Sequence, residues 1–121
     1  ISKRRKNAKF YQDNLNKKNI FFPLEQKNEF NTYHTFVIQI KSKSRDKLQK
    51  FLKKNKINTY INYKIPIHKQ LPVKKLRIKT KDLIKTETQA KKIISLPINH
   101  NLKKSQLVYV VKKINEFFNA K

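Results

Sequence analysis

Apolar residues recur with a helical period in four stretches of the chain. Residues 2–18, 45–54 and 103–119 space their apolar side chains three and four positions apart, which predicts amphipathic helices. A fourth helix is predicted to begin with Asp82 as its cap and to stop before Pro97. The stretch 103–119 is the most regular of the four, so the last helix is the firmest element of the prediction.

Two other stretches are predicted to be strands. Residues 32–41 and 57–63 are rich in β-branched and aromatic residues, which favour extended backbone. Between the first helix and the first strand, residues 20–24 form a short apolar segment that ends in a loop, and residues 71–81 are predicted to be irregular and basic. This order indicates an α/β fold of the α+β small-domain type, with a short, mainly antiparallel sheet covered by helices. Two strands are few for such a helix layer, so we also expect an open face that docks on a missing domain.

Local signals set the expected ends of the helices. Ser44 is a favourable N-cap for the helix over 45–54, and Asn55 is expected to end it in a left-handed conformation. Lys103 stands where a capping Ser or Thr would be favourable, so the start of the last helix is expected to be weakly capped.

Composition excludes several classes of protein. The 121 residues suffice for one domain or a piece of a larger one, and no run approaches the length of a membrane span. No secretory signal is visible, and cytoplasmic location is the expectation. Because the chain has no Gly and no Cys, it has no glycine-rich phosphate loop and no thiolate metal site. The chain has no Met, so we expect a processed or partial chain, and we expect Asn to serve turns of positive φ.

The formal net charge of +24 has two interpretations. It is compatible with nucleic-acid binding through phosphate neutralisation. However, 27 Lys against 4 Arg, with many Ile and Asn, is also the composition that an A+T-rich coding sequence favours. The lysines are scattered over every predicted helix, so compositional bias is the preferred interpretation. Arg4, Arg5 and the lysines within 74–81 are accordingly read as solvated charge and not as phosphate contacts.

The densest group of hydrogen-bonding side chains lies in the segment from Tyr60 to Gln70, just after the second predicted strand. Imidazole both donates and accepts, so His68 is a candidate for a ligand contact or for holding the loop in place. Tyr63 is a candidate ligand contact or a half-buried packing residue. Asn62 and Gln70 carry amides suited to a ligand or, somewhat preferred, to the backbone. Pro66 is interpreted as fixing the loop conformation.

The other histidines are not candidates for chemistry. His34 falls within a predicted strand and is interpreted as structural, and His100 falls in a predicted turn and is interpreted as solvated. Three histidines so far apart in sequence, without Cys or an acidic cluster, do not predict a metal site.

Taken in order, these patterns resemble the C-terminal segment of the DegT/DnrJ family, the fold-type-I sugar aminotransferases that use pyridoxal phosphate. The resemblance spans essentially the whole chain, and two of its patterns are fairly specific. The first, Tyr-x-x-Pro-x-His-x-Gln, stands at residues 63–70, and the second, Ser-Leu-Pro, stands at residues 95–97. The other matching residues are Arg4, Arg5, Ala8, Tyr11, Tyr33 to Ile38, Arg45 to Leu48, Ile57 to Thr59, Asn62, Glu87, Ala90 and Val110.

The resemblance implies a function and a division of the chain. Family members transfer an amino group, usually from glutamate, to keto-sugar nucleotides for surface polysaccharides and other glycans, and form homodimers. It implies that residues 1–19 are a helix leading from a large domain, and that residues 20–121 are the C-terminal small domain. The large domain would supply the Schiff-base lysine and hold the cofactor, so no catalytic residue is expected in this segment. Asn62, Tyr63, His68 and Gln70 would contact the substrate.

Other functions remain open at this level. A basic RNA-binding protein, such as a small ribosomal component, fits the length, the charge and the scarcity of acidic residues. A degenerate, inactive remnant of the family fits the missing glycines and the departures from the family pattern near Asn62.

Overall fold

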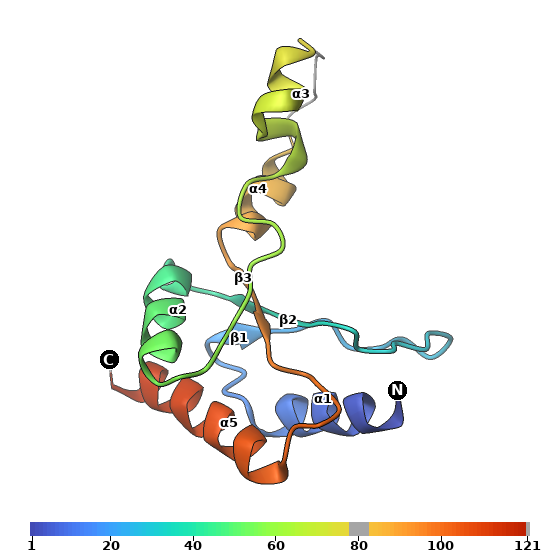
Figure 1. Ribbon diagram of the computed structural model, residues 1–121, viewed down its shortest axis with the longest axis vertical. Coiled ribbons are helices and arrows are strands. Elements are labelled where there is room, and N and C mark those ends of the chain that lie inside the picture. Colours follow the sequence, from blue (N-terminus) through green and yellow to red (C-terminus); the bar gives the residue numbers. More distant parts are fainter. Residues whose placement is uncertain (78–82, 121) are drawn as a thin grey trace.

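The protein is built around a small antiparallel sheet, seen in the computed structural model in Figure 1, which describes residues 1–77 and 83–120. The strands are β1 (Ile20–Phe21), β2 (Phe36–Ile40) and β3 (Ile93–Leu96), and β2 lies between the other two. Both pairings are antiparallel. The sheet is therefore assembled from three segments that lie far apart in the sequence.

Three helices form the layer that packs on this sheet, and they enclose one hydrophobic core. They are α1 (Ser2–Asn14), α2 (Arg45–Lys54) and α5 (Lys104–Asn119), and α1 and α5 lie side by side below the sheet in Figure 1. The core is fully buried at the side chains of Tyr11, Ile20, Ile38, Ile40, Leu48, Leu52, Ile94 and Ile114. This arrangement confirms the predicted α/β class, with helices covering a short antiparallel sheet.

A long arm, formed by residues 61–77 and 83–92, stands away from the helical layer (Figure 1). Its described part contains a 3-10 turn, η1 (Ile67–Lys69), and two short helices, α3 (Leu71–Lys75) and α4 (Ile84–Ala90). The arm exposes many large apolar side chains, namely Tyr63, Ile65, Ile67, Leu71, Leu76, Leu83 and Ile84. Such a run of exposed apolar residues is typical of a surface that contacts another domain or another protein.

The arm is tied to the sheet and to α2 by a buried arginine. Arg45 is 4% exposed, and its Nη1 donates to the carbonyl oxygens of Ala90 and Ile93, both at 2.9 Å. Its Nε donates to Asp46 Oδ1 at 2.8 Å. The guanidinium thus satisfies two backbone carbonyls at the point where the arm returns to the sheet.

Neither β1 nor β3 was predicted to be a strand. The fourth predicted helix ends at Ala90 and does not continue to Ile94, and the apolar run of β3 pairs with β2 instead. The helical stripe was misread, because a run of four residues fits a buried strand as well as a helix end. The proposed cap Asp82 lies outside the described residues.

The predicted strand over 57–63 is wrong. In this segment only Tyr60 pairs with the sheet, through an isolated antiparallel bridge to Ser95. The strand predicted over 32–41 is shorter and begins at Phe36. Residues 71–75, predicted to be irregular, form the short helix α3. The β-branched and aromatic residues of 57–63 thus belong to a segment that pairs with the edge of the sheet at one residue.

The end of α2 was predicted at the wrong residue. Asn55 has φ −89°, and Lys56 takes the left-handed conformation with φ 61°. The amide of Ile57 donates to Leu52 O at 2.9 Å and the amide of Lys56 donates to Lys53 O at 3.0 Å, which is the Schellman pattern. The expectation that Asn serves such positions is also wrong within residues 1–77 and 83–120, where the positive-φ residues are Tyr33, Lys56 and Arg77.

The amphipathic helices are confirmed as elements, but α1 ends at Asn14 and not at residue 18 as predicted. Helix α2 has the predicted bounds and buries Leu48 and Leu52. Helix α5 buries the predicted stripe, with Phe117 partly buried against Phe51 at a ring-centroid distance of 5.4 Å. At the start of α5, Gln106 Oε1 accepts from the Lys103 amide at 2.9 Å, so a glutamine side chain supplies capping.

Candidate functional site

The segment that carries most of the sequence candidates leads from the sheet edge into the arm. Tyr60 is held at the edge by reciprocal backbone hydrogen bonds with Ser95, of 3.2 and 2.7 Å. The peptide bond between Asn62 and Tyr63 is cis, and Pro66 then opens the turn η1. Gln70 Nε2 donates to Ile65 O at 3.2 Å, which closes the loop on itself. The amide of Gln70 is therefore engaged with the backbone, as the preferred interpretation expects.

His68 is fixed between two parts of the arm. Its Nε2 lies 3.0 Å from Glu87 Oε1, and its side chain is only 11% exposed. Lys69 Nζ donates to the other carboxylate oxygen, Oε2, at 2.8 Å. Hydrogen bonding from Lys69, and then from His68, holds the pKa of Glu87 below its ordinary value. The geometry thus favours a role in which His68 pins η1 to α4.

Three of the four candidates share one cavity, the arm cleft, of about 530 Å³. It is lined by Asn62, Tyr63, Pro66, Ile67, His68, Val73, Leu83, Thr86, Gln89, Ala90 and Ile93. Tyr63 is 67% exposed, and its hydroxyl makes no hydrogen bond within the described part of the chain. Gln70 does not line this cleft. The arm cleft can therefore offer a phenol and an amide to a ligand against a mainly apolar wall.

A second cavity, the basic cleft, has a volume of about 740 Å³ and was missed by the sequence analysis. It lies where α1, the segment 56–62, the segment 95–102 and α5 meet, and Asn62 lines both clefts. The residues of its lining that carry polar or aromatic groups include Arg4, His34, Lys56, Asn58, Tyr60, Asn62, Ser95, Asn99, His100, Ser105, Gln106 and Tyr109. No sequence motif points to it, because its residues come from separate segments.

The placement of two histidines corrects the sequence analysis in part. His34 is exposed, precedes β2 and lines the basic cleft, so it is not a strand-interior residue. His100 lies in a turn, as predicted, but also lines the basic cleft.

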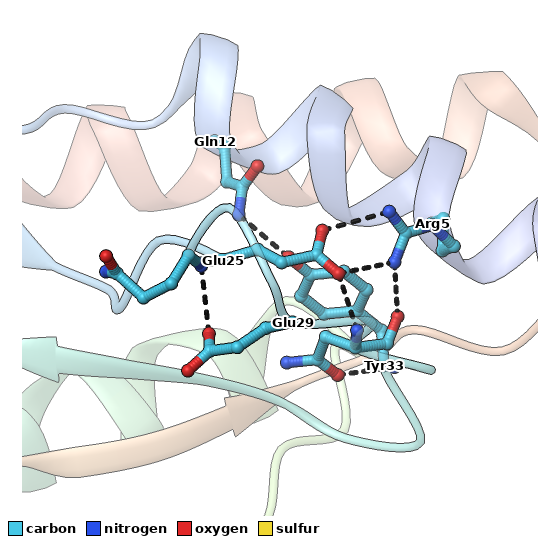
Figure 2. Close-up of polar contacts among 7 residues, drawn as sticks. Arg5, Gln12, Glu25, Glu29 and Tyr33 are labelled. Atoms are coloured by element: carbon cyan, nitrogen blue, oxygen red, sulfur yellow. Dashed lines mark hydrogen bonds and ion pairs between the residues drawn. The ribbon is translucent and has the colours of Figure 1, made fainter.

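The neighbouring Arg5 has a different role, shown in Figure 2. Its Nη1 and Nη2 donate to the two carboxylate oxygens of Glu25 at 2.8 and 2.9 Å, and Nη1 also donates to Asn31 O at 2.7 Å. The Asn31 amide donates to the same carboxylate at 2.5 Å. The Arg5 guanidinium also lies 4.3 Å from the ring centroid of Phe30. Arg5 is thus committed to fastening the loop before β2 onto α1, and is not free solvated charge.

The comparisons with known proteins agree on one family. The family model described as the DegT/DnrJ/EryC1/StrS aminotransferase family matches residues 1–115. The chain belongs to this aminotransferase family. The recognition made from the motifs at residues 63–70 and 95–97 is therefore confirmed.

Individual relatives of the DegT/DnrJ-type chain add detail. The pleiotropic regulatory protein of Geobacillus stearothermophilus is 38% identical over 96 residues, which cover 79% of this chain and 25% of that protein. The dTDP-3-amino-3,6-dideoxy-alpha-D-galactopyranose transaminase of Aneurinibacillus thermoaerophilus is 26% identical over 115 residues, 95% of this chain and 31% of that protein. The chain therefore spans only about a quarter to a third of the curated relatives it matches.

Solved structures show the same fold. The crystal structure of S. venezuelae DesV in complex with a ketimine intermediate matches with a TM-score of 0.87 at 24% identity, over 96% of this chain and 31% of that one. The comparisons do not favour the alternatives considered from the sequence, a basic RNA-binding protein or an inactive remnant. Among the residues that the structure describes, no helix has the length and apolar character that crossing a membrane requires.

Proposed function

We propose that this chain is the C-terminal part of a cytoplasmic, pyridoxal-phosphate-dependent aminotransferase that acts on keto-sugar nucleotides with glutamate as donor. In this proposal residues 1–19 lead from a large domain, and residues 20–121 form the small domain. Membership of the aminotransferase family over residues 1–115 carries the proposal, and the transaminase relative matched over 95% of the chain supports it.

The described linings of the arm cleft and the basic cleft lack several groups that would hold the cofactor. Pyridoxal phosphate needs a Schiff-base lysine, an acid at the pyridinium nitrogen and a phosphate cradle. Among the described residues, no Lys, Arg, Asp or Glu lines the arm cleft, and no carboxylate lines the basic cleft. The missing groups would come from the large domain.

The part that this chain takes in the reaction is to shape the substrate site. Asn62 and Tyr63 offer an amide and a free hydroxyl at the arm cleft, where a sugar hydroxyl could be bound. His68 and Gln70 hold the loop through their contacts with Glu87 and Ile65 O, so they act on the substrate by positioning the loop. The exposed apolar residues of the arm support contact with the large domain or with the second subunit of a homodimer.

The test uses the full-length protein that contains this chain. Amino transfer from glutamate to a keto-sugar nucleotide is measured for the wild type, Tyr63→Phe and the control Tyr33→Phe, whose hydroxyl lies away from both clefts. We expect Tyr63→Phe to lower kcat/KM by about 10-fold, the cost of one lost hydrogen bond to a ligand. The cofactor absorbance should stay unchanged in all three proteins.

Two results would contradict the proposal. If the full-length protein binds no pyridoxal phosphate and transfers no amino group, the proposed enzyme function is wrong. If kcat/KM is the same in Tyr63→Phe and Tyr33→Phe, the proposed substrate role of the loop is wrong, but the enzyme function is not contradicted.

A further inference from the structure

The two limbs of the arm are joined through one carboxylate. The leading limb is residues 61–77, and the returning limb is residues 83–92. Within these two ranges, both polar links between the limbs end on Glu87: His68 Nε2 lies 3.0 Å from Oε1, and Lys69 Nζ lies 2.8 Å from Oε2. Because residues of both limbs line the arm cleft, the position of its walls depends on Glu87.

Glu87 acts on the arm cleft from outside it. Thr86, Gln89 and Ala90 of α4 line the cleft at helical spacing, whereas Glu87 is not among the described lining residues. Its partner His68 does line the cleft, with a side chain that is 11% exposed. An effect of the carboxylate on a ligand in the cleft is therefore expected to pass through the imidazole.

The hydrogen bond to Glu87 determines which nitrogen of the imidazole carries a proton. An ionised carboxylate only accepts hydrogen bonds, so Nε2 of His68 must donate. Hydrogen bonding from Lys69, and then from His68, holds the pKa of Glu87 below its ordinary value, which keeps the carboxylate ionised at neutral pH. In neutral His68 the proton thus lies on Nε2 and Nδ1 keeps a lone pair. Nδ1 makes no hydrogen bond within the described part of the chain.

Lys69 fixes the orientation of the same carboxylate. One oxygen of Glu87 accepts from Lys69 and the other accepts from His68, so both oxygens are engaged. An ammonium group has donors and no acceptor, so the atom that faces it must be an acceptor. The arrangement therefore requires two acceptor atoms on residue 87, which a carboxylate has and an amide lacks.

We propose that Glu87 is a positioning residue of the substrate site, which holds His68 so that its Nδ1 accepts a hydrogen bond from a substrate hydroxyl in the arm cleft. The inference rests on the proposed function, since it needs a substrate in that cleft. It deepens the proposed function by adding a residue that acts without touching the substrate. The acceptor on His68 complements Tyr63 and Asn62, which bring a hydroxyl and an amide to the same cleft.

The first experiment measures where the ring of His68 is protonated in the full-length protein that contains this chain. Nitrogen–proton correlation spectra of the protein labelled at its histidine nitrogens distinguish the two tautomers at about pH 8, and His68→Asn assigns the signals. We expect the proton on Nε2 in the wild type. In Glu87→Gln the single amide oxygen faces Lys69, so the amide nitrogen donates to Nε2 and the proton moves to Nδ1.

A second substitution should restore the tautomer. In Glu87→Gln/Lys69→Met the amide oxygen has no competing donor, so it can accept from Nε2 again. A residue that only stabilised the arm would not recover when its second partner is also removed. The control is Glu116→Gln, because Glu116 also pairs with a lysine, Lys113 at 3.2 Å, but lies on α5 outside the arm.

Steady-state kinetics of amino transfer give the second readout. We expect Glu87→Gln to raise KM for the keto-sugar nucleotide about 10-fold with kcat nearly unchanged, because one hydrogen bond to the bound substrate is lost. The double variant should return to within about 3-fold of the wild type, and Glu116→Gln should equal the wild type. The cofactor absorbance should be the same in all of these proteins.

Three results would overturn the proposal: a proton on Nδ1 in the wild type, a proton that stays on Nε2 in Glu87→Gln, or a double variant whose KM remains as high as that of Glu87→Gln. The ring spectra do not depend on amino transfer, so they separate this inference from the proposed function. An inactive wild type contradicts the proposed function, whereas the wrong tautomer in an active enzyme contradicts the role of Glu87 alone.

Discussion

At the scale of single residues, the Arg5–Glu25 pair gives a pH-dependent test of the structure. The hydrogen bonds from Arg5, and then from the Asn31 amide, lower the pKa of Glu25 from its ordinary value of 4.5. The folded state thus favours the carboxylate. The stabilisation is present above the ordinary pKa and is lost as pH falls through the lowered one. We expect the Asn31 amide resonance, which reports on Glu25, to titrate with a midpoint below 4.5.

Two neighbouring arginines provide the test variant and its matched control. Arg5→Met should move this midpoint up toward the ordinary value, because the first of the causes is removed. Arg4→Met should leave it in place, since Arg4 makes no contact with Glu25 in the described structure. A midpoint that is the same in all three proteins would show that the pair does not form in solution.

At the residue level, candidates that are close in the chain also lie close together in the structure, and their substrate role stays a prediction. Asn62, Tyr63 and His68 were proposed together and do line one cleft. The basic cleft was missed because its lining is brought together by the pairing of Tyr60 with Ser95 and by the contact of α1 with the segment 97–99. Spacing along the sequence carries no information about such contacts.

At the scale of elements, the predictions that are confirmed are those for helices long enough to show a clear amphipathic period. Helices α2 and α5 run for several turns, so their amphipathic period identifies them without knowledge of the fold. Strand β3 has four residues, and its identity depends on pairing with β2, more than fifty positions earlier. Likewise, the left-handed end of α2 falls on Lys56 since the hydrogen bonds of Ile57 fix the geometry, and not because lysine favours it.

Arg45 joins three elements, and its removal should be costly. Arg45→Met leaves the carbonyls of Ala90 and Ile93 without their donor in a buried place. Because each lost partner of a buried polar group costs about 1–3 kcal/mol, we expect the free energy of unfolding to fall by about 3 kcal/mol. Urea unfolding followed by circular dichroism measures this quantity.

The control for Arg45 lies on the same helix. Lys47→Met changes an exposed residue of α2 and should alter the free energy of unfolding by less than about 0.5 kcal/mol. Equal effects of the two substitutions would show that Arg45 does not anchor the arm.

At the scale of the whole molecule, the arm and the body have different surfaces. The body closes over one core, whereas the arm leaves Ile67, Leu71 and Ile84 each more than 60% exposed. The chain spans about a quarter to a third of its curated relatives. The exposed arm is therefore the surface on which the proposed large domain or second subunit would be expected to pack.

The net charge of +24 affects the stability of the whole chain. Only seven acidic side chains face 31 Lys and Arg, so repulsion opposes the compact state. Salt screens this repulsion, and the Debye length falls from about 30 Å at 0.01 M to about 3 Å at 1 M. We therefore expect the thermal unfolding midpoint to rise by about 4 °C or more between 0.01 and 0.5 M NaCl, roughly 1 kcal/mol for a domain of this size. A variant with Lys3, Lys50, Lys91 and Lys112 changed to Gln should show a smaller rise. A midpoint that falls with salt would mean that the ion pairs outweigh the repulsion.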